Sequence, residues 1–560
     1  MVVFTLWQLT SGFLCPEECV CRSLSSSTHI DCSNSDLTTP PSFARPAPNR
    51  VLLTLSGNRL RRLPNQAFGN LTNIAALFLN DNELEALESG WAGASASSLL
   101  QLYLANNRLA NGNSGALDLD GFTVLDYLDI SNNGYNQLPS ISGVMDGLSS
   151  LSVSGNSISY LREDDLQPFN SLTSLYMADN VISSIHSQAL APVNSTLRYL
   201  DLSNNSLSSS DFLLLLEVIE SLLLHDNNIT LLELGNLSFA EGLRWLSASN
   251  NPIGNISLNG LSLLQRMECD RCELTTVEFP ISGLDSLLQL SLSANHLTEI
   301  PANLHLCSEL QRLNLSYNEL QIVPHTFKQS SYLTKLTSFD FSGNRFVYVP
   351  RRFIQQRFLE KVDMHHGELH GILDDTFNGN SSRITRIDLS YNQISYVGIN
   401  AFKGISSRAT IDLTRNQIVT LFEDIFTHPV IGLTLSYWDN PYVCDCLSRW
   451  LVTNMTQSVV HHAVCVGPAT LDLTLQPTIA STDLQCGSMT TYASTTITTP
   501  QVTSTASTSV TPGSTYETTE ESDADGIKYT TSPGGISDVV TTGTERTKRP
   551  PESVVGDGEL

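Results

Sequence analysis

The sequence predicts an α/β solenoid: a horseshoe of about 17 stacked units, with a concave parallel sheet of short strands and convex loops and short helices. Three observations predict this fold. One apolar phrase recurs throughout the stretch from Asn58 to Asn440, two cysteine clusters bracket that stretch, and the composition changes abruptly after Cys486. A chain of 560 residues suits such an array, because each unit packs only on its neighbours.

The recurring phrase is Leu-x-x-Leu-x-Leu-x-x-Asn-x-Leu. Clear copies are LLQLYLANNRL from Leu99, LRYLDLSNNSL from Leu197, LLQLSLSANHL from Leu287, LQRLNLSYNEL from Leu310 and ITRIDLSYNQI from Ile384. Position nine marks seventeen units: Asn58, Asn82, Asn107, Asn133, Asn156, Asn180, Asn205, Asn227, Asn251, Cys272, Asn295, Asn318, Asn344, Gly367, Asn392, Asn416 and Asn440. The first and last of these lie 382 residues and sixteen intervals apart, so the mean period is close to 24 residues.

Each letter of the phrase has a physical role. The Leu-x-Leu pair alternates with period two, which predicts a short strand with both leucines facing the core. The asparagine follows the strand, where its amide can bond to backbone groups of adjacent turns, so we expect a ladder of asparagines. The return segment on the convex side carries apolar residues such as Phe68, Phe327, Phe377 and Phe402. No unit buries its apolar face alone, so both ends of the array must be sealed.

Cysteine clusters stand where those seals are needed. The first cluster is Cys15, Cys19, Cys21 and Cys32, and the second is Cys444, Cys446, Cys465 and Cys486. Neither cluster has the paired spacing of a zinc finger, so we expect disulfide-bonded caps and an oxidising compartment. The residues alone leave the connectivity of these disulfides open.

With these motifs, residues 15–486 resemble extracellular leucine-rich-repeat ectodomains of the 24-residue type, such as Toll-like receptor ectodomains and variable lymphocyte receptors. CPEECVC resembles the N-terminal cap of that family, and LSYWDNPYVCDC resembles its C-terminal cap. The resemblance implies that the first cysteine pairs with the third and the second with the fourth: Cys15–Cys21, Cys19–Cys32, Cys444–Cys465 and Cys446–Cys486. Toll-like receptors normally continue into a membrane helix and a cytosolic signalling domain, which this sequence does not show.

The predicted domain organisation follows from these boundaries. Residues 1–14 read as a signal peptide, 15–48 as the N-terminal cysteine-rich cap, 49–440 as the leucine-rich repeats, 441–486 as the C-terminal cysteine-rich cap, and 487–560 as a disordered Ser/Thr-rich stalk. In the stalk, 29 of 74 residues are Ser or Thr. No stretch reaches the roughly 18 apolar residues of a membrane helix. We therefore expect a protein that is secreted or held at the extracellular face of the plasma membrane.

Three cysteines fall outside the caps. Cys269 takes an inward leucine position, Cys272 takes a ladder position, and Cys307 lies in the next unit. We expect Cys269 and Cys272 to be buried and reduced, as cysteines inside cores commonly are. A disulfide that involves Cys307 is the alternative. One of the three thiols must stay unpaired unless the chain dimerises through it, so a homodimer stays open.

Charge and glycosylation motifs narrow the partners. The net charge of -26 leaves no basic face for nucleic acid. Nine Asn-x-Ser/Thr sequons predict N-glycosylation in a secreted protein: Asn70, Asn194, Asn204, Asn228, Asn236, Asn255, Asn314, Asn380 and Asn454. Asn314 stands between the inward residues Leu313 and Leu315, so a glycan there would block ligand from that part of the concave face.

Aromatic residues stand at outward strand positions in the first half of the array. We define the aromatic strip as Phe78, Tyr103, Tyr127, Tyr176, Tyr199 and Trp245. Exposed aromatic residues on a rigid sheet commonly carry interface energy, so our hypothesis is that this strip binds the ligand. The alternative is that these aromatic residues are incidental. The second half is mainly charged, and its recurring Asp-Leu-Ser phrase is explained by turn capping.

No motif for catalysis is present: the sequence lacks a GxSxG elbow, a phosphate loop and an HExxH pair. We therefore predict no enzyme activity and no cofactor. The best polar cluster is His365, His366, Glu368 and His370. His365 and His366 point to different faces of a strand and turn, so we interpret them as surface histidines and predict no metal site.

The predicted function is an extracellular protein-binding or pattern-recognition receptor module, with an innate immune role as one form of it. The ligand is a protein or a glycan, bound on the concave or lateral face of the solenoid. The alternative is a cell-adhesion or extracellular-matrix protein, similar to small leucine-rich proteoglycans or neuronal guidance proteins.

Overall fold

A computed structural model describes residues 13–43, 47, 49–111, 116–143, 145–235, 237–324, 327, 333–378, 381–426, 433–443 and 460–461. The chain divides into two compact units, Met1–Ser488 and Met489–Leu560, and every described residue belongs to the first. The predicted stalk, residues 1–12 of the predicted signal peptide and the four cysteines of the predicted C-terminal cap lie outside the described residues.

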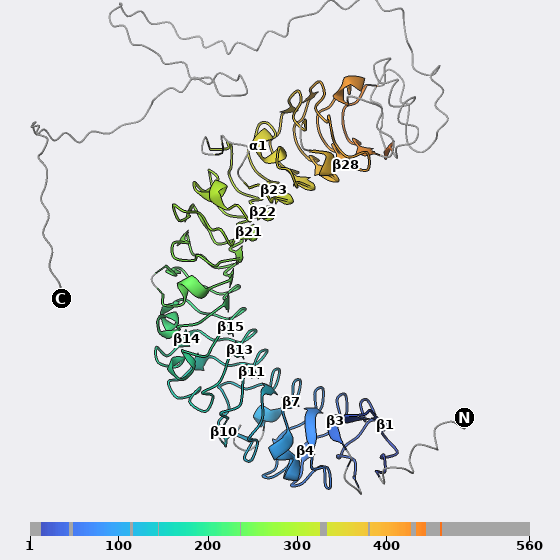
Figure 1. The fold of residues 1–560 in the computed structure, drawn as a ribbon, viewed down its shortest axis with the longest axis vertical. Coiled ribbons are helices and arrows are strands. Elements are labelled where there is room, and N and C mark those ends of the chain that lie inside the picture. The colour runs from blue at the N-terminus through green and yellow to red at the C-terminus, as the bar shows by residue number, and fades with distance from the viewer. Residues whose placement is uncertain are drawn as a thin grey trace, which may run out of the picture. The chain divides into compact units, whose positions relative to one another are not determined.

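One sheet runs through the described part of the first unit, on the inner side of the arc in Figure 1. It has twenty strands in chain order, and all its pairings are parallel except that of β1 with β2. The strands are β1 (Val20–Ser23), β2 (Ser27–Asp31), β3 (Arg50–Thr54), β5 (Ile74–Phe78), β7 (Gln101–Tyr103), β9 (Tyr127–Asp129), β11 (Ser150–Ser152), β13 (Ser174–Tyr176), β15 (Tyr199–Asp201), β16 (Ser221–Leu223), β17 (Trp245–Ser247), β19 (Arg266–Glu268), β21 (Gln289–Ser291), β22 (Arg312–Asn314), β23 (Ser338–Asp340), β24 (Lys361–Asp363), β26 (Arg386–Asp388), β28 (Thr410–Asp412), β29 (Thr434–Ser436) and β30 (Val460–His461). Seventeen of them, from β3 to β29, are repeat strands, which confirms the predicted solenoid.

The core lies behind this sheet and is built from the leucines of the phrase. Leu102, at the centre of β7, pairs in register with Leu77 on one side and Leu128 on the other. All three side chains are buried, and so is Leu104 at the next inward position. Full burial of one leucine side chain contributes about 1.5–3 kcal/mol to the stability of the fold. Because the leucines recur with the period of the phrase, stacking the units in this register buries all of them together.

The predicted asparagine ladder is present. The Asn107 side chain donates hydrogen bonds to Leu104 O (2.9 Å) in its own unit and to Leu79 O (3.0 Å) in the preceding unit. Its side-chain oxygen accepts a hydrogen bond from Leu84 N (2.9 Å). Each such asparagine therefore joins two successive turns and satisfies backbone groups that would otherwise be buried without partners.

Short elements and aromatic rings form the convex side. Among the described residues these elements are the parallel pairs β4 (Arg62–Leu63) with β6 (Ala86–Leu87), β8 (Leu117–Asp118) with β10 (Ile141–Ser142), β12 (Tyr160–Leu161) with β14 (Ser184–Ile185), β18 (Asn255–Ser257) with β20 (Thr276–Glu278) and β25 (Gly371–Ile372) with β27 (Tyr396–Val397). The helix α1 (Arg351–Ile354) and the 3-10 turns η1 (Gly93–Ser98), η2 (Leu109–Asn111), η3 (Ala191–Val193), η4 (Asp211–Leu215), η5 (Ala240–Gly242), η6 (Leu304–Leu306), η8 (Ser381–Arg383) and η9 (Glu423–Ile425) complete them. The convex phenylalanines are buried, and Phe377 stacks on Phe402 with ring centroids 5.4 Å apart. No helix in the described ranges is long and apolar enough to cross a membrane.

The N-terminal cap closes the first end of the sheet. Cys15 is bonded to Cys21 and Cys19 to Cys32, in the same pairing that the family resemblance implies. The antiparallel strands β1 and β2 lie between and beside these bonds, and β2 pairs with the first repeat strand β3. The edge of the parallel sheet is thereby covered by a crosslinked hairpin, as a solenoid end requires.

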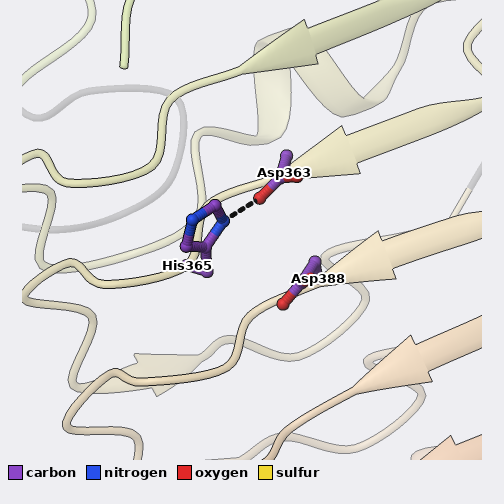
Figure 2. A group of neighbouring side chains, drawn as sticks. All are labelled: Asp363, His365 and Asp388. Carbon is purple, nitrogen blue, oxygen red and sulfur yellow. Dashed lines mark hydrogen bonds and ion pairs between the residues drawn. The ribbon is translucent and has the colours of Figure 1, made fainter. Parts of the chain in front are cut away.

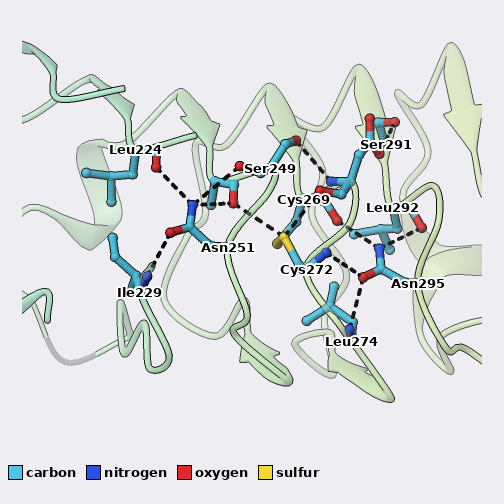
Figure 3. Close-up of a disulfide and its surroundings, with 12 residues drawn as sticks. Leu224, Ile229, Ser249, Asn251, Cys269, Cys272, Leu274, Ser291, Leu292 and Asn295 are labelled. Carbon is cyan, nitrogen blue, oxygen red and sulfur yellow. Dashed lines mark hydrogen bonds between the residues drawn. A yellow bond between two sulfur atoms is a disulfide. The ribbon is translucent and has the colours of Figure 1, made fainter. Parts of the chain in front are cut away.

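The central cysteines differ from the expectation. Cys269 and Cys272 form a disulfide, so the prediction that both are reduced is wrong (Figure 3). The turn after β19 brings their Cα atoms to 5.6 Å, within the usual range for a disulfide. The bond occupies the ladder level between Asn251 and Asn295. Cys307 is buried and forms no disulfide with any described cysteine, so the alternative pairing is not formed either.

Candidate ligand-binding site

The best-ordered part of the aromatic strip is a group of three rings on adjacent strands. Phe78 ends β5 and Tyr103 ends the neighbouring β7, and their rings stack with centroids 4.6 Å apart at 10°. Tyr127 begins β9 and places its ring 4.9 Å from that of Tyr103. All three side chains are partly exposed. We call Phe78, Tyr103 and Tyr127 the first aromatic group.

Tyr176 on β13 and Tyr199 on β15 form a second, smaller group, with ring centroids 4.8 Å apart. Strand β11 lies between the two groups and presents only Ser150 and Ser152 outward. The strip is therefore interrupted at β11 rather than continuous. The first aromatic group offers the larger stacked surface.

Trp245 on β17 stands apart from both groups. The guanidinium carbon of Arg266 lies 4.8 Å from the centre of its ring. Arg266 is held in turn by Glu268, with a nitrogen to oxygen distance of 2.6 Å. The face of Trp245 that the sequence offered to a ligand is thus covered by an intramolecular cation–π contact.

Two tyrosines of the strip, Tyr127 and Tyr199, have raised pKa values. Burial, helped by the nearby carboxylate of Asp129, raises the pKa of Tyr127 to about 12. Burial and Asp201 raise the pKa of Tyr199 to about 12 in the same way. These phenols keep their protons at physiological pH, so the site offers flat apolar faces, O–H donors and adjacent carboxylates. That combination suits binding of a partner.

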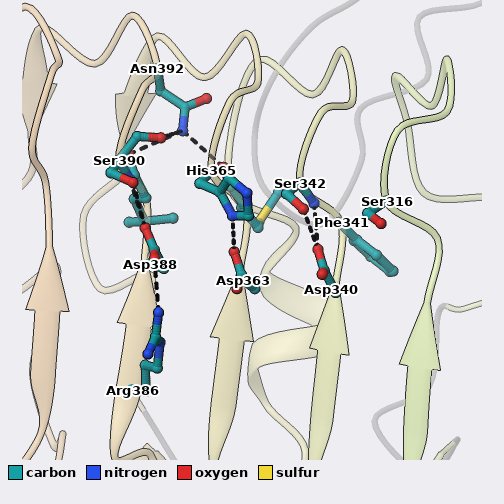
Figure 4. A network of polar contacts seen from close by, with 12 residues as sticks. Ser316, Asp340, Phe341, Ser342, Asp363, His365, Arg386, Asp388, Ser390 and Asn392 are labelled. Atoms are coloured by element: carbon teal, nitrogen blue, oxygen red, sulfur yellow. Dashed lines mark hydrogen bonds and ion pairs between the residues drawn. The ribbon is translucent and has the colours of Figure 1, made fainter. Parts of the chain in front are cut away.

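The charged half of the concave face is organised by turn capping. Asp340 Oδ1 accepts a hydrogen bond from Ser342 N (2.9 Å), and Asp412 Oδ1 accepts one from Thr414 N (2.9 Å). Asp388 Oδ1 accepts from both the amide (3.2 Å) and the hydroxyl (2.7 Å) of Ser390 (Figure 4). The aspartate at the end of each of these three strands therefore caps the turn that follows, as predicted.

The histidine cluster is split, and His365 has partners that the sequence did not indicate. The His366 ring stacks on Tyr391, with centroids 4.0 Å apart. His370 Nδ1 contacts its neighbour Glu368 at the backbone oxygen (2.7 Å). His365 instead contacts Asp363 and faces Asp388 of the next strand (Figure 2). The missed signal was the register of β24 with β26, which aligns Asp363 with Asp388.

Comparison with known proteins supports the assignment of the fold. Residues 51–109 match the family described as Leucine rich repeat, and residues 196–216 and 309–330 match a second family of the same description. These segments coincide with units whose strands and ladder asparagines are described above. The chain contains leucine-rich repeats.

This leucine-rich-repeat protein is 29% identical over 246 residues to human oligodendrocyte-myelin glycoprotein. The matched region covers 43% of the chain and 44% of that protein. It is also 35% identical over 99 residues to leucine-rich repeat-containing protein 3 of Danio rerio, and this matched region covers 18% of the chain and 36% of that protein. The chain thus spans less than half the length of these curated relatives.

Two solved structures show the same fold at low identity. A Leptospira interrogans leucine-rich-repeat protein is 20% identical, with a TM-score of 0.56, over 77% of this chain and 94% of its own. A chain of the Drosophila Toll–Spatzle complex is 20% identical, with a TM-score of 0.53, over 76% of this chain and 56% of its own.

Among the six sequons that the structure describes, four lie on exposed positions. Asn70, Asn204, Asn228 and Asn255 are exposed, while Asn194 and Asn314 are partly exposed; Asn236, Asn380 and Asn454 lie outside the described residues. Asn314 ends β22 and lines a concave pocket together with Arg312 and Lys361. A glycan on Asn314 would hinder large ligands on this stretch of the concave face, whereas the first aromatic group lies on β5, β7 and β9, away from it.

Proposed function

We propose that this leucine-rich-repeat protein is an extracellular recognition module, and that it binds a protein ligand at the first aromatic group. The observation that carries the proposal is the stack of Phe78, Tyr103 and Tyr127 on three adjacent strands of a rigid sheet. Tyrosine side chains supply large contact area at low cost in conformational entropy, which is why binding surfaces of antibodies are rich in them. The neighbouring Asp129 favours a ligand with basic residues near the contact.

Several observations support an extracellular location. The N-terminal cap is crosslinked by two disulfides, and such bonds persist in oxidising compartments. The exposed sequons agree with secretion, and the stalk composition agrees with a spacer that holds the repeats away from a surface. Fold similarity to a chain of the Toll–Spatzle complex, a complex of developmental and immune function by its title, makes an innate immune role one form of the proposal.

A cell-adhesion or extracellular-matrix function is the second candidate. It is favoured by the similarity to oligodendrocyte-myelin glycoprotein, which is the longest of the sequence matches given above. In this form the ligand would be another cell-surface or matrix protein rather than a soluble signal. Both candidates use the same concave face, so the identity of the retained ligand separates them.

The test is a binding screen with the full chain against secreted proteins, cell-surface proteins, collagens and microbial glycans. Each retained ligand is then measured against Tyr103→Ala/Tyr127→Ala and against Tyr160→Ala, a control that removes an exposed tyrosine from the convex strand β12. A residue that dominates an interface contributes about 2 kcal/mol or more, so the double variant should bind at least roughly thirtyfold more weakly. The control should bind as the wild type does.

The melting temperature distinguishes the outcomes. The double variant should lose binding without a lower melting temperature, because its rings lie on the surface of the sheet rather than in the core. If the double variant melts earlier and still binds, the aromatic rings are structural and the proposal is wrong. Ligands that are all collagens or matrix proteins would favour the adhesion candidate.

A further inference from the structure

Three potential metal-ligating side chains meet on the concave face, far from the first aromatic group. Asp363 ends β24, His365 follows it by two residues, and Asp388 ends the adjacent strand β26. One donor atom from each residue lies within 4.8 Å of the others (Figure 2). The side chains are 29%, 26% and 14% exposed, so the group is partly shielded from water yet accessible. Within the described residues, no other three such groups meet in this way.

The β24 unit differs from its neighbours at one position. In the units of β23 and β26, the residue two places after the aspartate is a serine, Ser342 or Ser390, which donates a hydrogen bond to the aspartate of its own unit. In the β24 unit that position is His365, whose imidazole contacts Asp363 where a serine hydroxyl would otherwise stand (Figure 4). A turn-capping hydroxyl is thus replaced by an imidazole, which is a common ligand of transition metals.

Charge on this part of the face favours a cation. Asp340, Asp363 and Asp388 are aligned in register on three adjacent strands, which are about 4.8 Å apart in a sheet. Like charges at that spacing repel each other. Arg386 offsets part of the charge, because its guanidinium lies 3.2 Å from Asp388 Oδ2. No basic side chain is within ion-pair distance of Asp363 apart from the imidazole of His365, as far as the described chain shows.

We propose that Asp363, His365 and Asp388 bind one divalent transition-metal ion of the zinc class, with water in the remaining positions. One nitrogen and two oxygen donors suit such an ion better than calcium or magnesium, which prefer oxygen ligands alone. Zinc-to-ligand bonds of about 2.0–2.2 Å require donors about 3.3 Å apart, so the donor atoms, which lie within 4.8 Å of one another, must approach by at most roughly 1.5 Å. Rotation of the Asp388 side chain away from Arg386 supplies this movement.

The test uses the full chain without an affinity tag, freed of metal with a chelator, and Zn2+ followed by calorimetry. Wild type should bind one ion that His365→Ala no longer binds, and Asp363→Asn should weaken binding by at least about tenfold, as expected for loss of a metal ligand or its partner. His296→Ala is the matched control: its ring lies 3.8 Å from Glu319 without a third donor group in the described chain. This control should bind as tightly as the wild type.

Two further variants sharpen the result. Arg386→Gln removes the competing cation from Asp388 and should tighten Zn2+ binding several-fold, an effect that a merely structural role of the cluster would not produce. Tyr103→Ala/Tyr127→Ala should leave Zn2+ binding unchanged, so failure of the metal site and failure of the proposed function are distinguishable. The melting temperature of each metal-free variant verifies folding, and Asp363→Asn, which keeps the shape of the side chain, decides the matter should His365→Ala misfold.

Three outcomes would overturn the proposal. The first is the absence of saturable Zn2+ binding to the wild-type chain. The second is equal binding by wild type and by both His365→Ala and Asp363→Asn, which would place the ion elsewhere in the chain. The third is preference for Ca2+ over Zn2+, which would show that the carboxylates act without the imidazole.

Discussion

Replacing one ladder asparagine, Asn295, tests how the units are held together. Its side-chain oxygen accepts hydrogen bonds from Cys272 N and Leu274 N, both at 2.9 Å. Its amide nitrogen donates to Cys269 O (2.8 Å) and Leu292 O (2.9 Å), and the residue is 4% exposed (Figure 3). Asn295→Ala leaves two buried N–H groups without acceptors.

Each buried donor without a partner costs about 1–3 kcal/mol, so Asn295→Ala should lower the free energy of unfolding by about 2–6 kcal/mol. The residue at the preceding ladder position is Cys272, whose side chain has no amide group that could replace that of Asn295. The control is Asn170→Ala, since the exposed Asn170 makes one long bond of 3.4 Å to Asp146. Its expected effect is within about 0.5 kcal/mol.

Denaturant unfolding followed by circular dichroism gives the overall change. Repeat arrays can unfold in parts, so hydrogen exchange by mass spectrometry should accompany it. The loss of protection should centre on the amides of Cys272 and Leu274. Equal destabilisation by Asn295→Ala and Asn170→Ala, or a loss of protection remote from these amides, would refute the ladder as the link between turns.

Two other predictions concern titration and thiol chemistry. The hydrogen bond to Asp363, together with the surrounding carboxylates, raises the pKa of His365 above its usual 6.5. The contact of protonated His365 with Asp363 therefore contributes fully to the stability of the fold below about pH 6.5, and this contribution is lost as pH rises through the raised folded pKa. In the metal-free protein, the melting temperature of wild type should exceed that of His365→Ala by more near pH 6 than near pH 8.5. A difference that does not change with pH would contradict this prediction. Burial raises the pKa of the Cys307 thiol to about 11, so alkylation at neutral pH should label Cys307 only after unfolding, and non-reducing peptide maps should recover Cys269 linked to Cys272. Rapid alkylation of the native Cys307, or reduced Cys269 and Cys272, would show that the cysteine assignment is wrong.

The repeat architecture was predictable because its determinants are local. Leucines or other apolar residues at the inward strand positions, and an asparagine three residues after the second of them in most units, are both readable without knowledge of distant contacts. Leu104 and Asn107 illustrate this: the structure buries the first and bonds the second to the preceding turn. The serines of β11 were also readable, and Ser150 and Ser152 could have shown that the aromatic strip is interrupted.

The rest depends on geometry that the phrase does not specify. Cys269 and Cys272 occupy two separate roles in the phrase, and only the path of the turn shows that their side chains meet. His365 and Asp388 are 23 residues apart, and they meet because β24 and β26 pair in a particular register. Trp245 looked available in sequence, yet Arg266 from the next strand covers its ring.

A glycan wedge tests most directly whether the first aromatic group is the ligand-binding face. Tyr103→Asn with Ala105→Ser installs an Asn-Leu-Ser sequon at the end of β7, the strand position that Asn314 occupies in β22. Tyr160→Asn with Arg162→Ser places an equivalent sequon on the convex strand β12. With glycan attachment verified by mass spectrometry, we expect the wedge on β7 to abolish ligand binding and the wedge on β12 to preserve it, both at an unchanged melting temperature. Undiminished binding by the chain glycosylated on β7 would contradict the account.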